Sequence, residues 1–191
     1  MRLANYACKR ALLNDEVIAF LEQNAQVIGE SEFKDYIFMP DSGKLDTDKE
    51  MKWIRYMIKT VRPDTNSGKF YPYYKQNITW NDGFQRFNMP IGVPARECSS
   101  LDEAKMILGC KSDYIFSFIK KTREYRYDNM FIYIEKVEGI KATIEIVCYD
   151  ERNDLEKNII VINSFMQKHN ITHAVVNQTA TLVKKVKEHA F

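Results

Sequence analysis

The chain opens with a short β-prone segment, residues 2–10, and continues into a stretch with the periodicity of a helix. Apolar residues there recur every three or four positions, as on one face of an amphipathic helix. They are Val17, Ile18, Leu21, Ala25 and Ile28. Asn14 is a suitable N-cap and Gly29 a suitable stop, so the pattern predicts a helix between them.

Most of the remaining hydrophobic positions alternate with polar ones or form short aromatic and β-branched runs, which is typical of strands. The predicted strands cover residues 32–39, 51–62, 69–80, 84–98, 113–127, 130–137 and 141–149. Turn-forming residues separate them, including Asp128-Asn129 and Glu138-Gly139. Further helices are predicted at 99–109, 151–170 and 178–189.

This element order indicates one α+β domain, residues 1–191, with C-terminal helices from about residue 151. Many strands with short turns imply an antiparallel sandwich or barrel. Neither a P-loop nor a G-x-G-x-x-G pattern occurs, so the sequence does not support those nucleotide sites.

Composition narrows the setting of the protein. Apolar residues make up 45% of the 191, without an apolar run long enough for a membrane span, and the N-terminus does not resemble a signal peptide. The four cysteines show neither zinc nor disulfide spacing, so a reducing cytoplasm is expected. A net charge of +2 is too small to indicate nucleic acid by itself, although it does not exclude it.

Basic residues recur within the predicted strands, where half-buried positions are usually apolar. They are Arg55, Lys59, Lys75, Arg86, Arg96, Lys121 and Arg123. If the strands close into a barrel, cations on the inner face would be intolerable in a dry core but would suit a wet tunnel that holds a polyanion. The alternative is that these cations point outward into water.

Several short motifs resemble, in the same order, those of the CYTH domains, also called triphosphate tunnel metalloenzymes. They are "DYIFMPDSGKL", "KWIRYMIK", "YYKQN", "ARECSSLDEAKMILG", "FIKKTREYRY" and "IYIEKVEGIKATIEIV", between residues 35 and 147. The resemblance implies an eight-stranded antiparallel β tunnel barrel with flanking helices, in which Lys and Arg hold a triphosphate and glutamates hold Mg²⁺ or Mn²⁺. The matching basic positions are Lys9, Arg55, Lys75, Arg96, Lys121 and Arg123.

The sequence departs from the family pattern where the metal should bind. Asn5 and Ala7 stand in place of two glutamates of the first strand, and Val147 in place of one near the end. Glu145 matches the remaining glutamate, and Glu135 replaces an aspartate. A single matching carboxylate is a weak Mg²⁺ site.

Three hypotheses follow. The leading one is a tunnel that binds a nucleotide or another phosphorylated small molecule, with metal-dependent catalysis lost or altered. The second is an active triphosphatase or adenylyl cyclase-like enzyme whose metal site is rebuilt from Glu135, Glu145 and Glu97. The third is a protein-interaction module on the same scaffold.

Two further patterns carry less weight. His169 and His173 are four residues apart, a spacing that can hold a metal on a helix, but they lie at a predicted helix end without a nearby acid. A group of tyrosines could stack on a nucleobase or serve only as packing residues. They are Tyr71, Tyr73, Tyr74, Tyr125 and Tyr127.

Overall fold

The computed structural model describes residues 4–62, 65–81, 84–89, 96–148, 155–172 and 179–188. Within them the chain forms eight strands. These are β1 (Ala4–Leu12), β2 (Gln26–Phe38), β3 (Met51–Thr60), β4 (Phe70–Asn81), β5 (Phe84–Met89), β6 (Phe116–Tyr127), β7 (Met130–Val137) and β8 (Thr143–Cys148). The helices are α1 (Asp15–Asn24), α2 (Leu101–Leu108), α3 (Leu155–Lys168) and α4 (Thr179–Glu188).

All the strand pairs are antiparallel. Their hydrogen-bonded order is β1-β5-β4-β3-β2-β6-β7-β8, and β8 pairs again with β1, so the sheet closes into a barrel. The predicted α+β class, with an antiparallel sheet and flanking helices, is confirmed. None of the helices in the described residues is long and apolar enough to cross a membrane.

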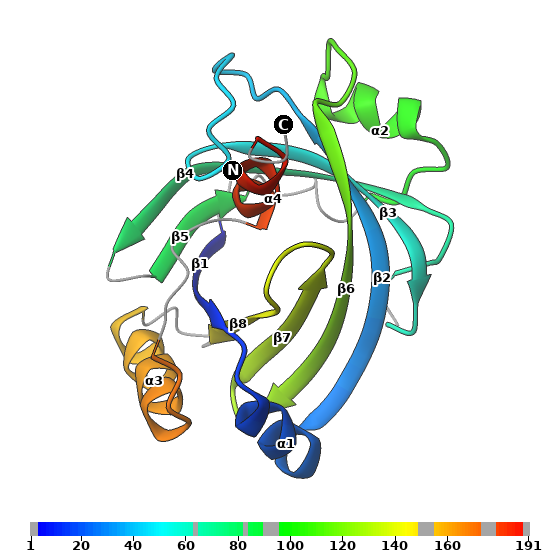
Figure 1. Cartoon of the computed structure of the whole chain (residues 1–191). Helices are drawn as coiled ribbons and strands as arrows, with labels where there is room; N and C mark the ends of the chain where they lie inside the picture. Colours follow the sequence, from blue (N-terminus) through cyan, green and yellow to red (C-terminus); the bar gives the residue numbers. More distant parts are fainter. Residues whose placement is uncertain are drawn as a thin grey trace.

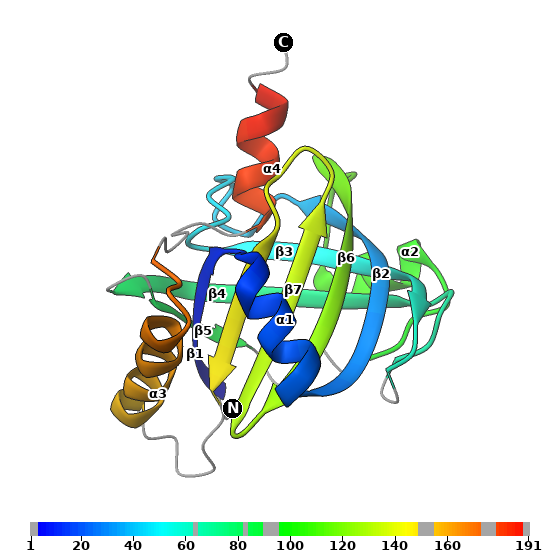
Figure 2. The ribbon, with the colours of Figure 1, turned by 60° about the horizontal axis from the view of Figure 1, so that its bottom comes forward.

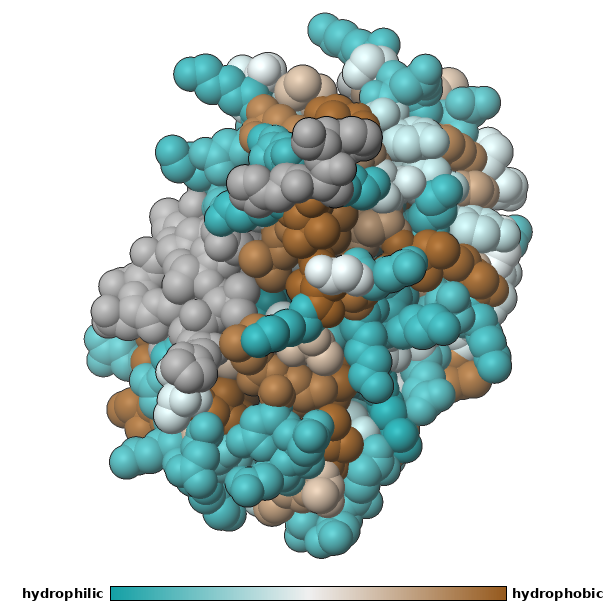
Figure 3. Space-filling view, viewed as in Figure 1, coloured by the Kyte–Doolittle hydropathy of each residue, from teal (hydrophilic) through white to brown (hydrophobic). Residues whose placement is uncertain are grey.

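The helices lie outside the sheet or at its end (Figures 1 and 2). Helix α1 crosses the outer face of the barrel, α3 lies beside β1 and β8, and α2 packs against β3 and β4. Helix α4 stands at one end of the barrel (Figure 2). In the space-filling view, apolar side chains gather toward the middle of the face and hydrophilic ones surround them (Figure 3).

The largest apolar core lies between the outer face of the sheet and helices α1 and α3. Ile132, Ile144 and Ile146 point outward from β7 and β8 and pack with Leu21 of α1 and Ile162 of α3. The inner face of these strands is thereby left for other side chains, because residues alternate between the two faces. This division of faces places polar residues inside the barrel.

Helix α1 is shorter than the sequence pattern predicts. The Asn14 side chain caps its start by accepting from the Glu16 and Val17 amides, as expected, but the helix ends at Asn24 instead of continuing to Ile28. Residues from Gln26 onward extend β2 and pair with β6. The helical prediction was wrong there because strand pairing overrode a weak local preference.

Candidate functional site

A cavity of about 300 Å³ lies inside the barrel, and the first turn of α4 forms part of its wall. This volume is at the lower end of the range for small-molecule pockets. Every strand with described inward side chains contributes, so the cavity is assembled from distant parts of the sequence. A ligand of modest size would be surrounded on most sides.

The lining of the cavity mixes both signs of charge. Its basic side chains among the described residues are Arg10, Arg55, Arg62, Lys75 and Lys120, and its carboxylates are Asp35, Glu124, Glu135 and Glu145. Cations outnumber carboxylates by one. The cavity is therefore polar, as a tunnel for an anion requires, but the carboxylates of the same lining neutralise much of its positive charge.

Arg10 is at the centre of the largest charged cluster. Its guanidinium pairs with the Glu145 carboxylate and lies 3.4 Å from Glu135. Lys120 donates to the other oxygen of Glu135, and the Thr179 hydroxyl of α4 donates to Glu135 at 3.0 Å. These contacts satisfy a buried carboxylate and tie the end of α4 to the barrel wall.

A second charged pair lies across β2 and β3. Arg55 donates from Nε and one terminal nitrogen to the two oxygens of Asp35, at 2.8 and 3.0 Å. This bidentate geometry is the strongest form of such a pair. The same guanidinium lies 3.6 Å from the centre of the Phe33 ring, so its position is fixed by both contacts.

Arg62 and Glu124 form a third pair, at 3.1 Å. Gly29 makes room for it: a Cβ atom at this glycine would come within 2.7 Å of the Arg62 Cγ. Gly29, which the sequence pattern assigns to a helix stop, instead permits the close approach of the Arg62 side chain to β2.

Aromatic side chains of β2, β3, β4, β6 and β7 line the cavity: Phe33, Trp53, Tyr73, Phe118 and Tyr133. Trp53 and Tyr73 stack with ring centres 4.9 Å apart and an angle of 11° between planes. The Lys75 ammonium lies 5.7 Å from the centre of the Trp53 ring. Burial lowers the pKa of Lys75, and Glu145 opposes that shift.

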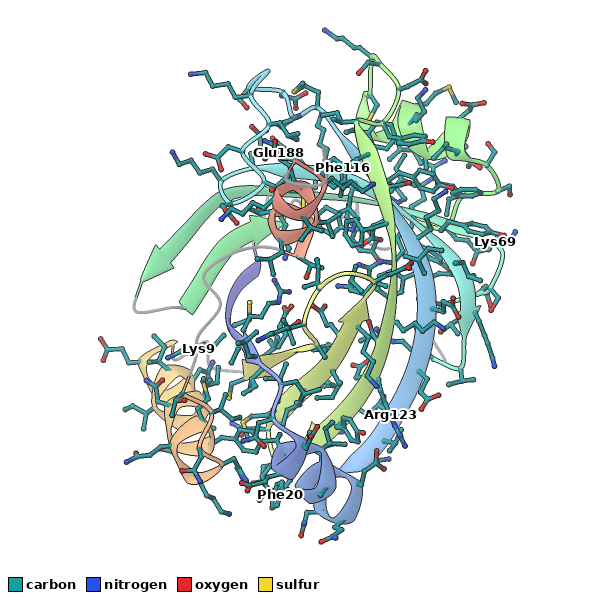
Figure 4. The ribbon with its side chains drawn as sticks, viewed as in Figure 1. Lys9, Phe20, Lys69, Phe116, Arg123 and Glu188 are labelled. Atoms are coloured by element: carbon teal, nitrogen blue, oxygen red, sulfur yellow. The ribbon has the colours of Figure 1, made fainter. Side chains whose placement is uncertain are left out.

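The structure separates the predicted basic residues into two groups. Of the predicted basic side chains that the structure describes, only Arg55 and Lys75 line the cavity. Lys9 points to α3, where it donates to Asn163 at 2.9 Å, and Arg123 lies on the outer side of β6 (Figure 4). Lys59 and Lys121 share an outer groove with Arg123, Arg96 is exposed, and the Arg86 side chain lies outside the described part.

A bulge explains Lys59. Glu32 pairs with Lys59 and Phe33 pairs with Met57, so Ile58 is the extra residue of β3. Such an insertion reverses the alternation of faces. Arg55 and Met57 point into the cavity, whereas Lys59, beyond the bulge, points outward.

The β6–β7 hairpin explains Lys121 and Arg123. Its two-residue turn, Asp128-Asn129, pairs Thr122 with Glu135. Opposed residues share a face, so an inward Glu135 requires Thr122 to point inward and its neighbours Lys121 and Arg123 to point outward. The tight turn in the sequence therefore already fixed which β6 residues face inward. The same register identifies Lys120 and Glu124 as lining residues.

The residues that sequence reasoning missed are Arg10, Arg62, Lys120, Asp35 and Glu124. Arg10 follows Lys9, the residue matched to the family motif, and has the opposite orientation. Asp35 lies within a quoted motif but carries no sign of its ion pair in sequence. The pairing of Asp35 with Arg55 depends on the β2–β3 register, which a long connecting loop leaves undetermined.

The described residues do not fit a divalent-cation site. No group of three or more His, Cys, Asp or Glu side chains within them is arranged to hold a metal ion. Glu135 and Glu145, the predicted ligands, both engage Arg10, whose guanidinium provides the positive charge between them. Their role as metal ligands remains a prediction.

The tyrosines and histidines singled out in the sequence also lie partly inside and partly outside the cavity. Only Tyr73 of the five tyrosines lines the cavity. Tyr71 donates to Glu97, Tyr74 to Glu50 and Tyr125 to Glu22. His169 packs between Phe20 and Phe165, with ring centres 4.1 and 4.5 Å away, and His173 lies outside the described residues.

Glu135 should make stability sensitive to acid. Burial alone would raise its pKa, but Lys120 and Arg10 lower it well below the ordinary value of 4.5. A carboxylate with a depressed folded-state pKa stabilises the fold above its unfolded-state pKa, and this contribution is lost as pH falls toward the folded-state value. Urea unfolding from neutral pH to about pH 3 should therefore show the difference between wild type and Glu135→Gln shrinking below pH 4.5; a constant difference would contradict this.

Comparison with solved structures identifies the architecture. PH1819 from Pyrococcus horikoshii OT3 superposes with a TM-score of 0.71 at 16% identity, covering 95% of this chain and 99% of that one. HpAC1 from Hippeastrum, a proposed adenylyl cyclase with a dominant triphosphatase activity, gives 0.65 at 12% identity, covering 95% and 96%. The chain has the CYTH-type fold. A proposed adenylate cyclase from Vibrio parahaemolyticus shares it, with a TM-score of 0.65 at 12% identity over 94% of this chain and 98% of that one.

These identities are low, so the likeness concerns the CYTH-type fold and not the activity. No protein-family model matches the chain, and no curated protein matches it in sequence. The function must therefore be argued from the cavity itself.

Proposed function

We propose that the barrel is a tunnel that binds a nucleotide or another phosphorylated small molecule, and that metal-dependent catalysis is lost or altered. The support is a cavity within the CYTH-type fold that is lined by basic side chains from several strands. Lysine and arginine are the side chains suited to phosphate oxygens. The fold relatives named as proposed cyclases make a phosphorylated ligand a reasonable class to test.

The proposal that metal-dependent catalysis is lost or altered rests on the contact of Arg10 with both Glu135 and Glu145. In metal-assisted phosphoryl transfer, carboxylates hold a cation that neutralises charge developing on the phosphate. Here the two carboxylates are already neutralised by a guanidinium and, for Glu135, also by Lys120. A buried guanidinium can stabilise charge on a bound phosphate, but it cannot leave and exchange as a metal ion does.

Lys75 is the best candidate for a direct phosphate contact. It lies in the cavity beside the Trp53 ring. Arg55 is held by the two oxygens of Asp35, and Lys120 is engaged by Glu135, so a phosphate would have to share or replace those carboxylates. Binding through Lys75 would leave the Arg55–Asp35 and Lys120–Glu135 pairs in place.

Titration calorimetry with nucleotides, inorganic tripolyphosphate and other phosphorylated small molecules, with and without Mg²⁺, tests the proposal. Lys75→Ala is expected to weaken binding by about tenfold or more, since a charge-assisted hydrogen bond is lost. Lys136→Ala is the matched control: this lysine is exposed on β7, next to Glu135 but on the other face, and should change affinity by less than about twofold. Failure of every compound to bind at low salt would remove the proposal.

An active metal-dependent triphosphatase or cyclase is the second candidate, because Glu135 and Glu145 both face the cavity. Phosphate and pyrophosphate release should be assayed with Mg²⁺ and Mn²⁺. Turnover that disappears in Glu145→Gln would favour this candidate over a binding protein. Equal background rates in both proteins would eliminate it.

A further inference from the structure

We infer that Arg62 receives the phosphate group of an entering ligand, at the end of the cavity opposite helix α4, by exchanging the Glu124 carboxylate for the phosphate. This inference rests on the proposed function and adds to it the route into the cavity. Three observations carry it: the position and exposure of Arg62, the glycine that its side chain crosses, and the second partner of Glu124.

Arg62 lies at the end of the cavity that is far from α4. Alternate residues of β2 line the cavity from Gly29 to Ile37, a distance of roughly 25 Å along the strand. Ile37 packs in one cluster with Ala180 and Val183 of α4, and this helix stands at that end of the barrel (Figure 2). Gly29, at the other end of the lining, lies against Arg62. Among the described residues, a route into the cavity that leaves α4 in place therefore passes Arg62.

Arg62 is also more exposed than cations deeper in the cavity. Its side chain is 31% exposed. The corresponding values are 7% for Arg10, 10% for Lys120 and 21% for Arg55. Lys75 lies opposite the first residue of β3, whereas Arg62 lies just beyond the last one. A partly exposed cation at the entrance meets an anion before the buried cations do, and it raises the local concentration of that anion.

The Arg62 side chain crosses strand β2 at a glycine to reach Glu124 on β6. Strand β2 lies between β3 and β6 in the barrel, and a Cβ atom at Gly29 would come within 2.7 Å of the Arg62 Cγ. The backbone amide of Arg62 is fixed separately, because it donates to the Thr60 hydroxyl at 3.1 Å. With its backbone anchored and a glycine beneath its side chain, the guanidinium can change partner without a movement of the sheet.

Glu124 keeps a second partner when Arg62 turns away. Its side chain is 4% exposed and lies 3.1 Å from Arg62, and the Tyr133 hydroxyl of β7 also hydrogen-bonds to it. Burial and the Glu124 carboxylate raise the pKa of Tyr133, so this hydroxyl remains a donor. A buried carboxylate that retains a hydrogen bond costs less than one that loses every partner. A phosphate carries more negative charge than a carboxylate and matches the guanidinium fork, so it competes with Glu124 for Arg62.

The test is the association rate constant, measured by stopped-flow tryptophan fluorescence because Trp53 lines the cavity. The probes are ATP, AMP and inorganic tripolyphosphate at low salt. Arg62→Gln should lower the rate constant about tenfold, since the cation that attracts the phosphate is lost. Glu124→Gln should raise it about threefold or more, since the competing carboxylate is removed. A pair that only holds the fold together would not give opposite changes from its two halves.

Lys69→Gln is the matched control, because it removes the same charge a few residues further along the chain. Lys69 lies outside the cavity and pairs with Glu97 at 3.4 Å (Figure 4). Its substitution should change the rate constant by less than about twofold. Equal slowing in Arg62→Gln and Lys69→Gln, or a Glu124→Gln protein that binds no faster than wild type, would overturn the inference and leave the proposed function intact. Absence of binding of every probe to the wild-type protein would overturn both.

Arg62→Gln leaves Glu124 without its cation, so circular dichroism and melting curves must establish that this variant folds. The double variant Arg62→Gln with Glu124→Gln removes both charges at once and keeps the test available if the single variant does not fold. It should bind the probes about tenfold more slowly than Glu124→Gln alone, as the loss of the same cation requires. Equal rate constants in these two proteins would overturn the inference.

Discussion

Replacing Glu135 with glutamine is expected to lower the free energy of unfolding by about 3–5 kcal/mol, the range for breaking a buried ion pair on one side. Glu135 is 5% exposed and engages Lys120, Arg10 and the Thr179 hydroxyl. The substitution removes the carboxylate that neutralises two buried cations, Lys120 and Arg10. It also weakens the hydrogen bond that joins α4 to the wall. Urea unfolding at neutral pH measures the loss.

Glu138→Gln is the matched control, since Glu138 is an exposed residue in the turn that follows the same strand. It should change the free energy of unfolding by less than about 0.5 kcal/mol. Equal losses in the two variants would show that the buried charge cluster has no special role in stability. A Glu135→Gln protein as stable as wild type would mean that water or a relaxed geometry replaces these contacts.

Truncating Ile162 to alanine should cost about 2–5 kcal/mol of unfolding free energy, because a fully buried side chain is replaced by a cavity. Ile162 is 0% exposed and lies in the cluster that joins α3 to the outer face of the sheet. The large expected effect follows from the location of the main core outside the barrel and not within it.

Ile160→Ala offers a control on the same helix with the same change of side chain. Ile160 is 64% exposed, so its truncation removes little buried surface, and alanine favours the helix. Its effect should stay within about 0.5 kcal/mol. Comparable losses at both positions, measured by urea unfolding, would contradict the assignment of the α3 face that packs on the sheet.

Local chemistry was enough to place most elements of this chain. Ser100 caps α2 by accepting from the Glu103 amide, and Gly109 ends that helix in a left-handed conformation, as their sequence positions predict. The strand predicted at 130–137 has the same bounds as β7. Caps, turns and two-residue periodicity act over a few residues, so a sequence displays them directly.

The site was only partly predictable. Arg55 and Lys75, which were predicted from the recurrence of basic residues in strands and from the family motifs, line the cavity. Lys59 was misplaced by a bulge, and Lys121 and Arg123 by a choice of face that the neighbouring hairpin register excludes. A shift of one residue exchanges the two faces of a strand, so a small error of register changes every lining residue that follows.

The sequence by itself determined the order of strands and helices, the resemblance to a tunnel fold, and the presence of Glu145 on an otherwise apolar strand. The tertiary structure alone decided that Arg10 lies between Glu145 and Glu135 and that Asp35 holds Arg55. It also decided that, among the described lining residues, cations exceed carboxylates by only one. The physical reason is that charge compensation depends on distances between side chains that are far apart in sequence. Those distances are set only when the strands pair and the barrel closes.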